Sequence, residues 1–101
     1  MSQEQTKNRV ETRHDLAPPP DYRVIYMNDD TTSFEFVTSS LVTVFEYQQD
    51  TATEKAAEIH EKGSSIVAVL PFEVAEQKGV EVLLSARNQG YPLEVRLEQD
   101  D

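Results

Sequence analysis

The chain has 101 residues, of which 38% are hydrophobic, and it carries a formal net charge of -10 without any cysteine. This length fits one small domain with a modest core. The lack of cysteine excludes disulfides, thiolate zinc sites and cysteine nucleophiles, and no apolar run reaches the roughly 20 residues that cross a bilayer. The acidity disfavours nucleic acid and anionic membranes as partners, although acidity also serves solubility alone.

The first 20 residues are expected to form a disordered tail with a proline-rich spacer. Residues 1–17 hold only Val10 and Leu16 as large aliphatic side chains, and their acidic and basic residues balance. The three prolines at 18–20 then form a stiff, extended spacer. We therefore divide the chain into a tail over 1–20 and a folded core over 21–99. The whole excess of negative charge lies in residues 21–101.

A strand followed by a helix is predicted at the start of the core. Residues 22–27 are β-branched and aromatic, which is typical of a strand. Apolar residues then recur at helical spacing over about 33–46. Thr32, with Glu35 three positions later, forms the pattern of a capping box, so we expect Thr32 to be the N-cap of this helix.

A second capping box, Thr51 with Glu54, predicts another helix that ends at about residue 62, before Gly63. Its water-facing side is rich in glutamate and lysine. The side expected to be buried consists of Ala52, Ala56, Ile59 and His60.

The last part of the chain predicts a strand, a helix and a strand. The run over 65–70 is short and apolar, with IVAVL at its centre, which indicates a strand buried on both faces. Pro71 suits the first turn of a helix that Gly90 closes, and residues 91–98 alternate as a strand with one wet face does. The fold class is α+β: a two-layer sandwich in which a three-stranded antiparallel sheet carries three helices on one face, in the order βααβαβ, with the other face polar.

The stretch between the first strand and the first helix, residues 28–32, forms a polar and acidic elbow. Asn28, Asp29, Asp30 and a neutral His60 all offer acceptors, which together match the three donors of an ammonium group. If His60 lies beside the elbow, an apolar cavity forms there, walled by Thr32, Phe34, Val37, Ala56 and Ile59. Such a site recognises a free amino group attached to a bulky apolar side chain; the alternative is that His60 is a hydrogen-bonded core residue.

The segments PPPDYRVIYMNDDTTSFEFV, AAEIHEKG, LPFEVAEQKG and ARNQGYPLEVRLE, which span residues 18–98, resemble ClpS, the adaptor of the bacterial Clp protease. The resemblance implies a monomeric adaptor of the bacterial cytoplasm that needs no cofactor and has no catalytic activity. It would bind proteins whose first residue is Leu, Phe, Tyr or Trp. It would deliver them to the N-terminal domain of a ClpA- or ClpC-type AAA+ unfoldase.

The resemblance also implies roles for single residues. Asn28, Asp30 and His60 would receive the substrate α-amino group and the first peptide bond, supported by Asp29. The side-chain pocket would be lined by Thr32, Phe34, Val37, Ala56, Ile59 and Leu93. Glu73 and Lys78 would contact the unfoldase, and the tail over residues 1–17 would engage it during delivery.

The chain departs from the usual pattern of the family around the pocket. Where the family has NDDYTPMEF, this chain has NDDTTSFEF, so Phe34 replaces a gating methionine, and Ala56 stands where a second pocket methionine is usual. We therefore expect a changed preference among the four residue types. Two alternatives stay open: a modulator that docks on the unfoldase without ordinary N-degron binding, and a small hydrolase or metal-binding protein. For the last, the sequence offers no nucleophile, phosphate loop or metal-ligand pattern.

Overall fold

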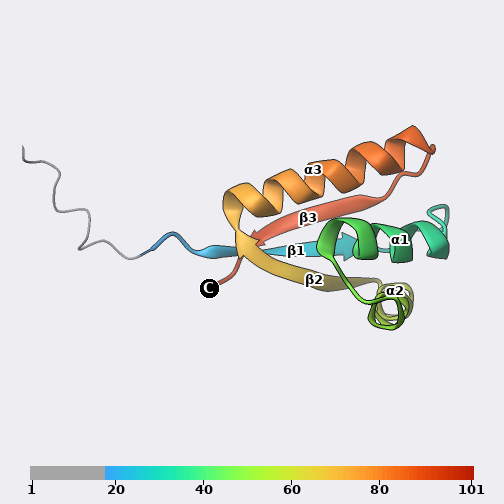
Figure 1. Cartoon of the computed structure of the whole chain (residues 1–101), viewed down its shortest axis with the longest axis horizontal. Coiled ribbons are helices and arrows are strands. Elements are labelled where there is room, and N and C mark those ends of the chain that lie inside the picture. The colour runs from blue at the N-terminus through green and yellow to red at the C-terminus, as the bar shows by residue number, and fades with distance from the viewer. Residues whose placement is uncertain (1–17) are drawn as a thin grey trace, which may run out of the picture.

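The computed structural model describes residues 18–101 and confirms the predicted order of elements. The expected disordered tail and delivery arm over residues 1–17 lie outside the described residues. β1 is the central strand and pairs antiparallel with β2 on one side and β3 on the other, which confirms the α+β sandwich (Figure 1). In chain order the elements are β1 (Asp21–Met27), α1 (Phe34–Phe45), α2 (Gln49–Lys62), β2 (Ser64–Pro71), α3 (Phe72–Asn88) and β3 (Glu94–Gln99).

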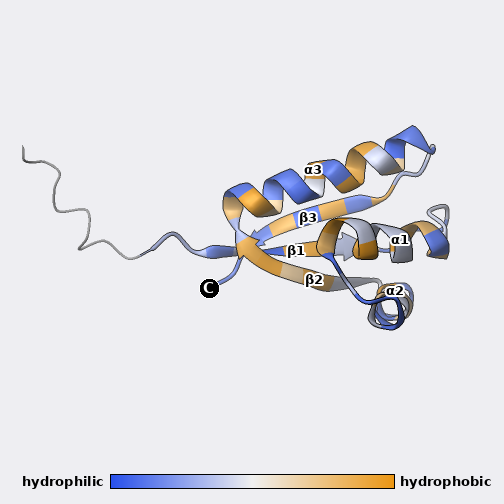
Figure 2. Ribbon diagram, viewed as in Figure 1, coloured by the Kyte–Doolittle hydropathy of each residue, from blue (hydrophilic) through white to orange (hydrophobic). Residues whose placement is uncertain are grey.

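The core lies between the helices and one face of the sheet. On β1 the buried residues Val24 and Tyr26 alternate with less buried neighbours, as expected for a strand with one covered face. Figure 2 shows the same division on α3, where hydrophobic and hydrophilic bands alternate along the helix. The helical residues buried in the core cluster are Phe36, Val37, Leu41, Val44, Ala52, Ala56, Ile59, Ala75, Val82 and Ala86.

The prediction that the second strand is buried on both faces is wrong. β2 lies at an edge of the sheet, and its Ile66 and Val69 side chains are 42% and 45% exposed, whereas Ser65 and Val67 are buried. The helices of residues 18–101 cover one face of the sheet. A shift in the β1–β2 pairing register lies between Ile66 and Val69, so both share the uncovered face although an odd number of positions separates them. The uncovered face is therefore partly apolar and not simply polar. The composition of the run did not reveal which of its residues face the helices.

The predicted helix starts also need correction. The N-cap of α1 is Ser33, whose hydroxyl accepts a 3.0 Å hydrogen bond from the backbone N–H of Phe36. Thr32 lies one position before this N-cap, and its hydroxyl and N–H both donate to Asp29. α2 begins at Gln49, two residues before Thr51, and its N-cap, Gln48, makes no side-chain capping bond.

A buried polar chain fixes α1 on the sheet. The Ser40 hydroxyl donates to the carbonyl of Val37 at 2.8 Å, so it accepts at 2.8 Å from the hydroxyl of Tyr26 on β1. Burial raises the pKa of Tyr26 well above its ordinary value, even though the Ser40 bond acts in the opposite direction. Tyr26 therefore stays protonated and can act as the donor, which orients the α1 face that carries Val37.

Candidate functional site

A cavity of about 340 Å³, called here the elbow cavity, gathers residues from the elbow, α1 and α2. The elbow reaches the end of α2 through a 2.9 Å hydrogen bond from the N–H of Asn28 to the carbonyl of Gly63. Gly63 ends α2 with a positive φ of 90°, a conformation that glycine adopts without a steric penalty. The cavity is lined by Asn28, Asp29, Asp30, Thr32, Phe34, Val37, Ala56 and His60.

Asp29 holds the elbow together. Its carboxylate accepts hydrogen bonds from the N–H of Thr31 at 2.8 Å, the N–H of Thr32 at 2.7 Å and the hydroxyl of Thr32 at 2.7 Å. Partial burial acts to raise the pKa of Asp29, but these bonds outweigh it and hold the pKa below its ordinary value of 3.8. Asp29 is therefore ionised at neutral pH and has its acceptors largely occupied within the chain.

The other predicted acceptors are free within the described part of the chain. In residues 18–101, the side chains of Asn28, Asp30 and His60 have no hydrogen-bond or ion-pair partner, and all three residues are exposed. The expectation that His60 lies on the buried face of its helix is wrong; Ala52, Ala56 and Ile59 form that face, and His60 borders the cavity. A carboxylate, an amide oxygen and an imidazole nitrogen thus stand open to a donor-rich ligand.

The apolar side of the cavity comes from both helices. Phe34, in the first turn of α1, is 43% exposed, whereas Val37 and Ala56 are buried. Ile59 and Leu93, predicted as pocket residues, are only 2% and 1% exposed and belong to the core cluster; they are not among the lining residues of the cavity.

The two residues predicted to contact an unfoldase have different environments on α3. Glu73 is exposed in the first turn. Lys78 is partly buried: its Nζ donates to the carbonyl of Val44 at 2.8 Å and lies 5.9 Å from the centre of the Phe45 ring. Lys78 therefore ties α3 to the end of α1, a contact that the sequence analysis did not anticipate.

Arg87 also has a role that the sequence did not reveal. From the last turn of α3 its Nη1 donates to the carbonyls of Tyr91 and Leu93, at 2.9 and 2.8 Å, and its positive charge further lowers the pKa of Asp29. A basic residue near a helix end was visible in the sequence, but its partners lie beyond the helix. Arg87 thus fixes the loop before β3 and favours the ionised form of Asp29 in the elbow.

Two possible features are absent from the described residues. In residues 18–101, no group of three or more His, Cys, Asp or Glu side chains is arranged to hold a metal ion. No helix in the same residues is both long and apolar enough to span a membrane.

The family model described as ATP-dependent Clp protease adaptor protein ClpS matches residues 17–96. The chain belongs to the ClpS family. ClpS of Shewanella denitrificans is 40% identical over 98 residues, covering 97% of this chain and 94% of that protein. ClpS of Nitratidesulfovibrio vulgaris is 42% identical over 85 residues, covering 84% and 85% of the two chains.

A solved ClpS structure is also similar. The structure of Agrobacterium tumefaciens ClpS2 bound to L-phenylalaninamide matches with a TM-score of 0.80 and 35% identity, covering 82% of this chain and 100% of that chain. The present chain is thus an adaptor of the ATP-dependent Clp protease with the ClpS fold.

Proposed function

We propose that this ClpS-family adaptor recognises proteins by a free N-terminus whose first residue is Leu, Phe, Tyr or Trp. It delivers them to the N-terminal domain of a ClpA- or ClpC-type AAA+ unfoldase, as a monomer in the bacterial cytoplasm and without catalysis or a cofactor of its own. The observation that carries the proposal is the elbow cavity, where the open acceptors of Asn28, Asp30 and His60 adjoin an apolar wall.

The solved relative supports the same reading of the cavity. L-phenylalaninamide, bound to the Agrobacterium tumefaciens ClpS2, combines a free α-amino group with a bulky aromatic side chain. These are the two features that the open acceptors and the apolar wall of the elbow cavity complement.

The open acceptors and the apolar wall of the cavity are needed together. Burying a Leu or Phe side chain contributes about 1.5 to 3 kcal/mol, and each hydrogen bond to a charged group about 1.5 to 3 kcal/mol. Neither half gives useful affinity alone, since association has a substantial entropic cost. The site therefore favours a chain terminus over an exposed internal leucine, and acetylation of the terminus removes the charge that Asp30 attracts.

Phe34 and Ala56 favour aromatic first residues over leucine. Ala56 is a small side chain in the lining that also contains the Phe34 ring, so an aromatic ligand has room in the cavity and can meet that ring edge to face. Such aromatic pairs contribute about 0.5 to 1.5 kcal/mol beyond burial, which predicts a preference of about two- to twelvefold for Phe, Tyr and Trp over Leu.

Amine recognition and the aromatic preference can be tested by fluorescence anisotropy. The peptides are otherwise identical and begin with Leu, Phe, Tyr or Trp. An acetylated Phe peptide and an Ile peptide serve as controls. We expect binding that requires the free amine and ranks the aromatic residues first. Equal affinity for the acetylated control would contradict amine recognition, and equal affinities across the four peptides would contradict the preference. If no peptide bound, the modulator that docks on the unfoldase without N-degron binding would become the better account.

His60 provides a second test of the same site. A neutral imidazole nitrogen can accept a hydrogen bond from the ammonium group. His60→Ala should therefore lower the affinity for the Phe peptide at least about tenfold, the value of one hydrogen bond to a charged group. Because His60 is exposed, thermal unfolding should change little. Unchanged affinity of the His60→Ala variant would rule out the acceptor role.

A further inference from the structure

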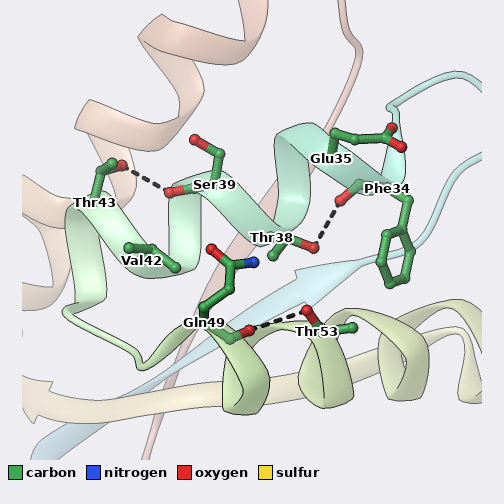
Figure 3. A pocket seen from close by; sticks show the side chains of 8 residues that line it. All are labelled: Phe34, Glu35, Thr38, Ser39, Val42, Thr43, Gln49 and Thr53. Carbon is green, nitrogen blue, oxygen red and sulfur yellow. Dashed lines mark hydrogen bonds between the residues drawn. The ribbon is translucent and has the colours of Figure 1, made fainter.

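A second cavity, of about 390 Å³, lies between α1 and α2 next to the elbow cavity, and we call it the α1–α2 groove. Phe34 lines both hollows, and Figure 3 shows its ring reaching from the first turn of α1 toward α2 at one end of the groove. On α2, Gln49 and Thr53 line the groove, and Ala56 and His60 line the elbow cavity. The spacing of these four residues places them on one face of the helix, so the two hollows follow each other along it.

The groove presents hydrogen-bond acceptors. Thr38, Thr43 and Thr53 each donate their hydroxyl proton to a carbonyl one turn earlier in the same helix, at 2.9, 2.9 and 3.0 Å (Figure 3). Thr38 is buried, but Thr43 and Thr53 are exposed, so the lone pairs of these two hydroxyl oxygens are left for an outside donor. Among the residues of 18–101 that line this groove, Glu35 is the only charged one. The lining therefore complements backbone N–H groups and neutral or basic side chains.

We propose that the α1–α2 groove binds the second to fourth residues of a polypeptide whose first residue occupies the elbow cavity, with a preference for basic over acidic side chains there. This proposal rests on the proposed function. From Ala56 back to Gln49 the helix rises about 10 Å, at 1.5 Å per residue. That length matches about three residues of extended peptide, at roughly 3.3 Å each.

The length dependence of binding tests the groove. L-phenylalaninamide and the five-residue peptide amide Phe-Ala-Ser-Ala-Ala share the first residue, but only the longer ligand reaches the groove. In competition anisotropy we expect the peptide to bind about tenfold more tightly, the value of one or two additional hydrogen bonds. Thr53→Trp, which fills the groove from α2, should reduce this ratio to near one and leave the affinity for L-phenylalaninamide unchanged.

A matched control lies on the same helix. Thr51 is exposed and lines neither cavity, so Thr51→Trp should leave both affinities unchanged. Gln49→Trp fills the groove at its other end and repeats the test if Thr53→Trp alters L-phenylalaninamide binding. A wild-type ratio near one, or a tenfold ratio that survives both groove substitutions, would overturn the groove proposal and leave the proposed function standing. Failure of both ligands to bind the wild-type chain would overturn the proposed function, and the groove proposal with it.

The charge preference has its own comparison. The five-residue peptide with Lys at position 3 should bind about threefold more tightly than the peptide with Asp there, since exposed charge pairs have small energies. Glu35→Gln should remove most of this difference. Glu54→Gln removes the same charge from an exposed position outside both cavities and should retain it. If the two variants behave alike, the preference comes from the net charge of the chain and Glu35 does not read the peptide.

Discussion

Asp29 and Asp30 are neighbours in sequence but differ in what surrounds them. The Asp29 carboxylate accepts three hydrogen bonds from Thr31 and Thr32, so it shapes the elbow. The Asp30 side chain has no hydrogen-bond partner within residues 18–101, and it borders the elbow cavity. A substitution of Asp29 should therefore mainly lower stability, and a substitution of Asp30 should mainly weaken ligand binding.

Asp29→Ala should lower the free energy of unfolding by about 1 to 2 kcal/mol, because two backbone N–H groups and a hydroxyl lose their acceptor. Asp30→Ala should leave the stability within about 0.5 kcal/mol, as is usual for an exposed residue without partners, and weaken binding of a Phe peptide about tenfold or more. Urea unfolding and anisotropy on both variants check the pair. Equal stability of the two variants would contradict the structural role of Asp29.

Acidification should reduce the stability that the ionised Asp29 carboxylate contributes. Its pKa in the folded chain lies below the ordinary value of 3.8, so the stability contributed by its ionised form is present above that pH. The contribution is lost as the pH falls below 3.8 and through the lowered pKa. Between pH 5 and pH 2.5, the stability difference between the wild type and Asp29→Asn should therefore shrink. A difference that grew toward low pH would contradict the direction of the pKa shift.

At the scale of elements, the elbow cavity depends on how α1 is held. Tyr26 on β1 and Ser40 on α1 connect this helix to the sheet. Lys78 on α3 donates to the carbonyl of Val44, near the C-terminal end of α1. Cations are favourable at that end of a helix. Lys78 therefore contributes to the fold in addition to any contact with an unfoldase.

Lys78→Met keeps the apolar stem and removes the donor, so it should lower the free energy of unfolding by about 1 to 2 kcal/mol. Lys62→Met is the matched control, because the Lys62 side chain is 71% exposed and lies 4.0 Å from its partner, Glu58. That variant should change stability by less than about 0.5 kcal/mol. Urea unfolding of both distinguishes them; an unchanged midpoint for Lys78→Met would show that its bond to Val44 contributes nothing.

At the scale of the whole molecule, the elbow cavity and the predicted delivery arm belong to different segments of the chain. Among residues 18–101, those that line the cavity lie between positions 28 and 60, while the predicted delivery arm occupies residues 1–17. Substrate recognition and delivery are therefore expected to depend on different parts of the chain.

A chain that begins at Pro18 should bind the Phe peptide within about twofold of the full chain, because it keeps every residue of the elbow cavity that the structure describes. It should fail to support degradation of a protein with an N-terminal Phe by a ClpA- or ClpC-type protease. Anisotropy checks the peptide affinity, and a degradation assay checks delivery. Loss of peptide affinity would contradict the division between core and tail, and undiminished degradation would contradict the delivery role of residues 1–17.

Much of this molecule could be predicted from local patterns. Hydrophobic periodicity is a property of neighbouring residues, so the order of strands and helices and the α+β class followed from it. The chemical types in the elbow were equally visible, since acceptors such as those of Asn28, Asp30 and His60 belong to the side chains themselves. The sequence by itself thus determined which groups are available to bind an amine.

The tertiary structure decided which of these groups are free. Asp29 is occupied because the N–H groups of Thr31 and Thr32, two and three residues along the chain, turn back onto its carboxylate. His60 borders the cavity because the bond between Asn28 and Gly63 brings the end of α2 to the elbow. Likewise Ile66 is exposed because no helix within residues 18–101 covers the outer face of β2. The positions of His60 and Ile66 depend on parts of the fold that are distant in sequence, and the Asp29 contacts depend on the backbone path of the elbow. A local pattern of residue types specifies neither.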